Sequence, residues 1–243
     1  MQPDLKPIRT DDRGFGRAPY EASPEVAYST AQGQKVLRNT YLLLAATMVP
    51  TVIGAFIGMQ TASIIMGAPI VSSLVMLAVV IGLQFAIAAN RNSGVGVALL
   101  LLMTGILGWW LGPILNFALA MKNGMQLVGY AAVGTGIIFF GMATLSQTIK
   151  RDLGFMGKFL FVGMIALLVA MIANMFLQIP ALALTISTLV IVVFSLFLLY
   201  DLQRIIRGGE TNYIMATTGV YMSLFNIFAN LLQILLALGG ERD

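Results

Sequence analysis

The 243-residue chain is 58% hydrophobic and only 10% charged, and its formal net charge is +4 at pH 7. Soluble domains carry about 25% charged residues, so this composition indicates an integral membrane protein. The chain has no cysteine and no histidine, which excludes disulfides, Ser-His-Asp catalysis and histidine-held zinc or haem. We therefore expect neither an enzyme nor a bound cofactor. The cations are scattered without a basic patch, so nucleic-acid binding is not expected either.

Residues 1–38 are polar and proline-rich, with mixed charges. Such a segment has too few apolar groups to offset the conformational entropy lost on folding. We therefore expect a disordered tail over residues 1–38 and a membrane domain over residues 39–243. The tail is either passive or a flexible segment that a cytoplasmic protease or regulator could engage.

Apolar segments then follow at short intervals, each long enough to cross about 30 Å of hydrocarbon as an α-helix. The prediction is an all-α bundle of seven transmembrane helices, near residues 41–59, 62–89, 95–119, 125–147, 155–179, 181–201 and 213–238. Pro50, Pro69 and Pro113 lie within these spans, so kinks or broken helix ends are expected.

The basic residues predict the orientation of this bundle, because positively charged loops stay in the cytoplasm. All but Lys122 and Arg242 of the 14 lysines and arginines lie in the tail or around the loops after the second, fourth and sixth spans. We therefore expect a cytoplasmic N-terminus and a C-terminus on the opposite side of the membrane.

Glycines repeat at a spacing of four in two of the spans. Gly54 and Gly58 in the first span, and Gly108 and Gly112 in the third, form GxxxG patterns that allow helices to approach closely. Glycine is also abundant in membrane helices generally, and we favour that explanation for any single pair.

The last span carries one small and polar face. Steps of four and three from Asn212 reach Ala216, Gly219, Ser223, Asn226, Asn230, Gln233 and Ala237, which form one stripe at helical pitch. Unpaired polar groups are costly in lipid, so the stripe should face other helices or internal water. We therefore place this helix at the centre of the bundle. Gln84, Asn174 and Gln178 are further amides within spans. Asn174 and Gln178 are four residues apart and should share one helix face, either as packing contacts or as the lining of a pathway.

Asp201 is the only carboxylate at the edge of, or within, a predicted span. Intramembrane ionisable groups often mark ion or proton pathways, so Asp201 with Ser223, Asn226 and Asn230 forms the candidate ion-pathway and pH-sensing group. As a calcium ligand, Asp201 would need help from neutral oxygens, and such a site would be weak. The alternative is an interfacial Asp201 paired with Arg204, one helical turn away.

Four stretches resemble the Bax inhibitor-1 family. They are RNTYLLLAATM, GILGWWLGPILN, ANMFLQIPAL and GGETNYIMATTGVYMSLFNIFANLLQIL, which begin at Arg38, Gly105, Ala173 and Gly208. The chain is most similar to the bacterial YccA-type branch, from about residue 35 to the C-terminus. The resemblance implies a seven-helix bundle in a bacterial inner membrane, with the last helix central and the C-terminus periplasmic.

The resemblance also implies two activities. YccA-type members are substrates and modulators of the membrane-anchored protease FtsH in membrane-protein quality control, whereas other bacterial members are pH-sensitive calcium leak channels latched by two aspartates. Asp201 matches the first aspartate, within Tyr200 to Gln203, but Ser223 stands at the second position. Two carboxylates in contact titrate as a coupled pair, and a single aspartate beside a serine lacks that coupling. Our first hypothesis is therefore FtsH modulation, with a calcium or proton leak as the alternative.

Overall fold

The computed structural model describes residues 24–239, and every element within that range is a helix. The helices are α1 (Pro24–Gln60), α2 (Ala62–Met66), α3 (Pro69–Ala89), α4 (Gly94–Leu119), α5 (Gly124–Thr148), α6 (Met156–Leu177), α7 (Pro180–Ile206) and α8 (Tyr213–Gly239). All of them except the short α2 contain a segment long and apolar enough to cross a membrane. The structure thus confirms an all-α protein with seven membrane-spanning helices.

The first helix begins earlier than the sequence suggested. The tail was expected to extend to residue 38, but α1 is helical from Pro24, and proline is favourable at the start of a helix. Val36 and Thr40 are already buried, because this part of α1 packs against the bundle. The boundary at residue 38 therefore does not separate tail from domain. Residues 1–23, which make up the rest of the expected tail, lie outside the described residues.

The second predicted span, residues 62–89, consists of two helices rather than one. Helix α2 ends at Met66 with Gly67 as its C-cap, and α3 begins at Pro69 after Ala68 adopts a non-helical conformation with φ −147° and ψ 72°. Proline lacks a backbone N–H and disfavours helical geometry in the residue before it, so the helix must restart there. Pro180 starts α7 in the same way.

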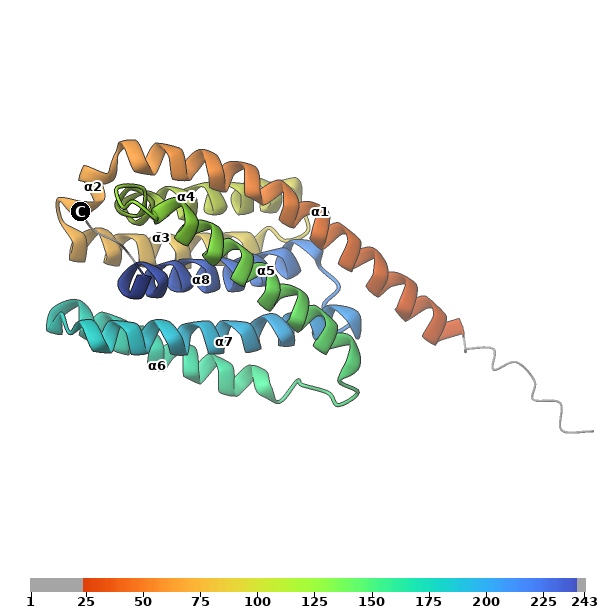
Figure 1. Cartoon of the computed structure of the whole chain (residues 1–243). Coiled ribbons are helices and arrows are strands. Elements are labelled where there is room, and N and C mark those ends of the chain that lie inside the picture. The colour runs from red at the N-terminus through yellow and green to blue at the C-terminus, as the bar shows by residue number, and fades with distance from the viewer. Residues whose placement is uncertain (1–23, 240–243) are drawn as a thin grey trace, which may run out of the picture.

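Helix α8 occupies the centre of the bundle, as its polar stripe predicted. It packs against α1, α3, α4, α5 and α7, and Figure 1 shows it in dark blue among them. Val220 and Ile227 of α8 belong to the main hydrophobic core together with Met103 of α4 and Leu202 of α7. The central position lets small and polar residues of α8 face protein instead of lipid.

All of the described basic residues except Lys122 gather at one end of the bundle. Figure 1 shows that the α3–α4, α5–α6 and α7–α8 connections lie at the end from which the start of α1 projects. The basic residues in these connections and the adjoining helix ends are Arg91, Lys150, Arg151, Lys158, Arg204 and Arg207. Lys35 and Arg38 lie on α1 near the same end, since Gly33 of α1 is beside the carbonyls of Ile205 and Ile206. Lys122 lies in the connection between α4 and α5, at the opposite end.

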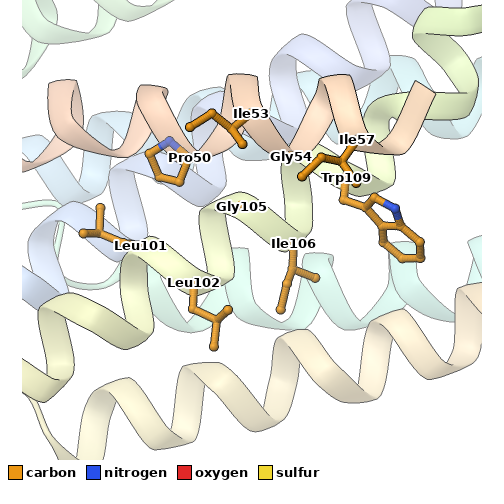
Figure 2. A pocket seen from close by; sticks show the side chains of 9 residues that line it. All are labelled: Pro50, Ile53, Gly54, Ile57, Leu101, Leu102, Gly105, Ile106 and Trp109. Atoms are coloured by element: carbon orange, nitrogen blue, oxygen red, sulfur yellow. The ribbon is translucent and has the colours of Figure 1, made fainter. Parts of the chain in front are cut away.

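Helices α1 and α4 pack backbone against backbone through their glycines. A Cβ atom added at Gly54 would overlap the backbone of Gly105, one at Gly112 would overlap Gly58, and one at Gly108 would overlap α1 as well. Figure 2 shows Gly54 and Gly105 facing each other at this crossing. The two GxxxG patterns therefore meet each other, so the general abundance of glycine in membrane helices does not account for them.

Two side-chain hydrogen bonds fix α1 against its neighbours. The Trp109 Nε1 donates to Thr61 Oγ1 at 2.8 Å and closes one end of the α1–α4 contact. The hydroxyl of Tyr221 lies 2.8 Å from Thr51 Oγ1, and Tyr221 is only 2% exposed. The first bond links Thr61, the residue that follows α1, to α4, and the second links α1 to the central helix α8.

The glycine contact leads to a first prediction. Gly58→Ala should lower the free energy of unfolding by about 1–3 kcal/mol, because the new methyl group meets the backbone of Trp109 and the helices must separate. Gly129→Ala on α5 is the matched control, since nothing lies within 4 Å of a Cβ atom at that position. It should leave stability unchanged or raise it by up to about 1 kcal/mol. Thermal unfolding of both variants in one detergent tests this, and equal stability would contradict the backbone contact.

Candidate functional site

Asp201 lies near the end of α7, and its carboxylate faces the central helix. A Cβ atom at Gly219 of α8 would lie 2.7 Å from Asp201 Oδ2, closer than such contacts normally come. Asp201 is partly buried in this position. The absence of a side chain at Gly219 therefore makes room for the carboxylate between α7 and α8.

Arg204 does not pair with Asp201. Its Nη2 lies 3.2 Å from Glu210 Oε2, and its Nε donates to the carbonyl of Gly209 at 3.2 Å. Within residues 24–239 no ion pair joins Arg204 to Asp201. The guanidinium is held by the α7–α8 turn, so the interfacial Asp201–Arg204 pair weighed from the sequence does not form in this structure.

Ser223, Asn226 and Asn230 continue from Gly219 along the polar stripe of α8. Ser223 is one helical turn beyond Gly219 and is 2% exposed. Asn226 Nδ2 donates to the carbonyl of Met222 at 2.9 Å, and Asn230 Nδ2 donates to that of Asn226 at 2.8 Å. Among the described residues, the Oδ1 atoms of these two amides accept no hydrogen bond. Both side chains therefore present acceptor oxygens.

A cavity of about 500 Å³ lies within the bundle beside these amides. Polar side chains from four helices line it: Ser73 and Gln84 of α3, Asn174 of α6, Ser187 of α7, and Asn226, Asn230 and Gln233 of α8. The remaining lining is apolar and includes Trp110 of α4. Amides that the sequence placed on separate spans thus converge on one internal space.

The structure divides the four predicted site residues between two places. Asn226 and Asn230 line the cavity, whereas Asp201 and Ser223 do not. Asp201 lies beside Gly219, nearer the end where the basic residues gather. The stripe of α8 therefore leads from a carboxylate at one end to a cavity without charged side chains at the other.

Gln178 does not join the other amides. It ends α6 in the left-handed conformation, with φ 53° and ψ 37°, so it does not continue the helical face of Asn174. Asn174 Oδ1 instead accepts a hydrogen bond from the backbone N–H of Ile179 at 3.1 Å. The predicted pair of amides on one face of the fifth span is therefore wrong for Gln178.

Calcium would find few ligands in this arrangement. Among residues 24–239, no three aspartate, glutamate, histidine or cysteine side chains come together. The cavity offers hydroxyl groups and amides, which are neutral, and calcium prefers several hard oxygens with carboxylates among them. Any role of Asp201 as a calcium ligand stays a prediction, and it would be a weak site.

Gln203 is a structural anchor that the sequence analysis did not single out. Its side chain is 2% exposed and crosses to the α5–α6 connection. Oε1 accepts the backbone N–H of Leu153 at 2.9 Å, and Nε2 donates to the carbonyls of Arg151 at 3.0 Å and Ile149 at 3.3 Å. The sequence feature that could have pointed to Gln203 is its uncharged amide near the end of a span, two residues after Asp201.

Comparison with known proteins matches residues 33–241 to the family model described as "Inhibitor of apoptosis-promoting Bax1". The chain belongs to the Bax inhibitor-1 family. The match spans the membrane-crossing part of α1 and every later helix, so Asp201 and the cavity both lie within the matched part of the chain.

Relatives within the Bax inhibitor-1 family cover most of the chain. It is 41% identical over 201 residues to the "Modulator of FtsH protease YccA" of Escherichia coli strain K12, with 83% of this chain and 89% of the relative aligned. An "Inner membrane protein YccA" of E. coli O6:H1 shows the same identity and coverage. An "Uncharacterized membrane protein" of Vibrio cholerae is 40% identical over 206 residues, 85% of this chain and 91% of the relative.

Gln203 gives a second prediction. Gln203→Leu should leave the buried N–H of Leu153 and the carbonyl of Arg151 without their partner, at a cost of about 1–3 kcal/mol. The α5–α6 connection should then open, and trypsin should cut faster after Lys150 and Arg151. Gln147→Leu is the control, because Gln147 is exposed and donates only to Ala143 of its own helix. Equal cleavage rates for the two variants would show that Gln203 does not hold the connection.

Proposed function

We propose that this Bax inhibitor-1 family member resides in a bacterial inner membrane and binds and modulates an FtsH-type membrane protease. It would act in membrane-protein quality control, itself a substrate of the protease as well as a modulator, and not as an enzyme. The observation that carries the proposal is the 41% identity, over 83% of the chain, to the E. coli modulator of FtsH protease. A relative described as an inner membrane protein supports the location.

The proposed orientation has a cytoplasmic N-terminus and a periplasmic C-terminus. The gathering of the described basic residues at the end from which α1 projects supports this, because positive ends face the cytoplasm. Helix α1 runs without interruption from Pro24 through the glycine contact with α4. A partner that engages residues 1–23 would therefore act on a helix that is packed into the bundle.

The tail provides the test of this proposal. Removing residues 1–23 deletes no residue of the described helices. The deletion should lengthen the half-life of the protein several-fold in cells that contain FtsH, because the protease could no longer bind the tail. The half-life in cells depleted of FtsH should not change. A variant in which the same residues are shuffled is the control and should still be degraded, since the protease would engage the segment through its length and composition rather than through a fixed sequence.

Modulation itself is measured separately from turnover. The intact chain, reconstituted with purified FtsH, should slow the degradation of a second membrane-protein substrate. A degradation rate that does not respond to the chain would remove the modulator role. If removal of residues 1–23 left the half-life of the protein unchanged, the tail would have no part in its turnover by the protease.

We retain a cation leak along α8 as a second candidate function, because of one observation at Asp201. The carboxylate faces Gly219 while Arg204 is engaged by Glu210, so a cation near Asp201 would not compete with an ion pair there. Ser223 and then Asn226 and Asn230 continue the polar stripe toward the cavity. With Ser223 at the position of a second aspartate, such a leak would lack the steep pH response of a coupled carboxylate pair.

Asp201→Asn tests the leak. Calcium entry into dye-loaded proteoliposomes should fall to the level of protein-free liposomes, because the only carboxylate on the proposed route becomes neutral. Asp152→Asn is the matched control, since Asp152 is an exposed residue of the α5–α6 connection that accepts a local hydrogen bond from Gly154. Calcium entry that is equal in all three proteins would remove Asp201 from any pathway.

A further inference from the structure

We propose that the cavity between α3, α4, α6, α7 and α8 binds a neutral single-chain lipid whose head group carries hydroxyl groups, of the monoacylglycerol class. The inference goes beyond the protease role and does not depend on it. It rests on three properties of the cavity: its polar groups, its apolar walls and the side from which it is reached.

The polar groups of the cavity carry no charge, and two of them present acceptor oxygens. Asn226 and Asn230 use their Nδ2 atoms on carbonyls of their own helix, which leaves the Oδ1 atoms to receive a donor. A hydroxyl group is such a donor, and it can reach these oxygens because, among the described residues, no unpartnered side-chain oxygen is fully buried. No aspartate, glutamate, lysine or arginine is among the lining residues. A phosphate, carboxylate or ammonium head group would enter without a counter-charge, so the ligand must be neutral.

The walls of the cavity suit a flexible hydrocarbon chain. Five methionines line them: Met76, Met164, Met171, Met175 and Met222. Methionine side chains are unbranched and adaptable, and they are common where a binding surface must fit chains of variable shape. The volume of about 500 Å³ is in the range of sites for single small molecules. One acyl chain with a small head group therefore matches the cavity better than a two-chain phospholipid.

The cavity is reached from the membrane side. Leu74 and Ile81 of α3 and Met171 of α6 line it and are 42%, 44% and 42% exposed. Helix α3 packs against α4 and α8, whereas α6 packs against α7, so the cavity occupies the space between these two outer helices. Exposed apolar residues of membrane helices face lipid, and a ligand that enters between them must itself be soluble in the bilayer.

The two tryptophans of the chain make the proposal measurable. Trp110 lines the cavity, whereas Trp109 lines a separate groove of about 350 Å³ on the outside of the α1–α4 contact (Figure 2). Trp109→Phe therefore leaves one reporter inside the cavity, and Trp110→Phe leaves one outside it. Both variants should elute like the parent protein, and Trp109→Phe should unfold at a somewhat lower temperature because it loses the hydrogen bond to Thr61.

Glycerol monodibromostearate is the probe, because bromine on its acyl chain quenches nearby tryptophan fluorescence. In lipid nanodiscs, quenching of Trp110 in the Trp109→Phe variant should saturate at a low mole fraction of probe. Quenching of Trp109 in the Trp110→Phe variant should instead rise in proportion to the probe in the membrane. Saturation with the same midpoint in both variants would overturn the proposal, because the cavity would then differ in no way from the lipid surface.

A second comparison tests the head-group recognition. Asn226→Leu combined with Asn230→Leu, in the Trp109→Phe background, should weaken binding of the glycerol probe roughly 10-fold. The fold should persist, since neither amide donates a hydrogen bond to another helix. Methyl dibromostearate has no hydroxyl group, and its binding should not change. Equal binding of both probes, with no effect of the amides, would show an apolar void without head-group recognition and would overturn the assignment.

Discussion

Hydrocarbon offers no hydrogen-bond partners, so a polar group within a span is stabilised only where the protein or a bound ligand supplies one, and this constraint shapes the whole bundle. The hydroxyl groups of Thr40 and Ser195 donate to carbonyls one turn back on their own helices, at 2.8 and 2.7 Å. Asn230 does the same with its amide. Because many polar side chains are satisfied within a helix, contacts between helices depend chiefly on shape. The glycine contact between α1 and α4 is the clearest case, since small residues let the two backbones touch.

The α1–α4 pair supports the central helix, and it connects the centre to the end where the basic residues lie. Tyr221 of α8 reaches Thr51 of α1, while Thr217 of α8 lies 3.4 Å from the carbonyl of Thr40. Helix α1 thus contacts α8 at two levels and extends outward from the same end of the bundle. A displacement of α1 would disturb both the glycine contact and α8. A partner that bound the N-terminal side of α1 and displaced this helix would therefore also disturb the core of the protein.

The helices could be predicted from the sequence because an apolar run of about 20 residues has few alternatives to a helix in a membrane. The central position of α8 could be predicted because its polar stripe would be costly to expose to lipid. The start of α1 could not be predicted, because composition near the tail does not reveal that Val36 and Thr40 are buried by other helices. The convergence of Gln84 and Asn174 on the amides of α8 also required the packing, since each amide alone is equally compatible with a local contact.

The separation of Asp201 from the cavity decides how the proposed roles relate to one another. Asp201 supplies charge beside Gly219, whereas Asn226 and Asn230 supply only neutral oxygens at the other part of the stripe. A cation that left the carboxylate would enter a space whose walls are mostly apolar, where water rather than protein must solvate it. A lipid in the cavity would remove that water and occupy the same oxygens. Occupancy by a neutral lipid and passage of a cation would therefore exclude each other, so the lipid composition of the membrane would set whether any leak through α8 is open.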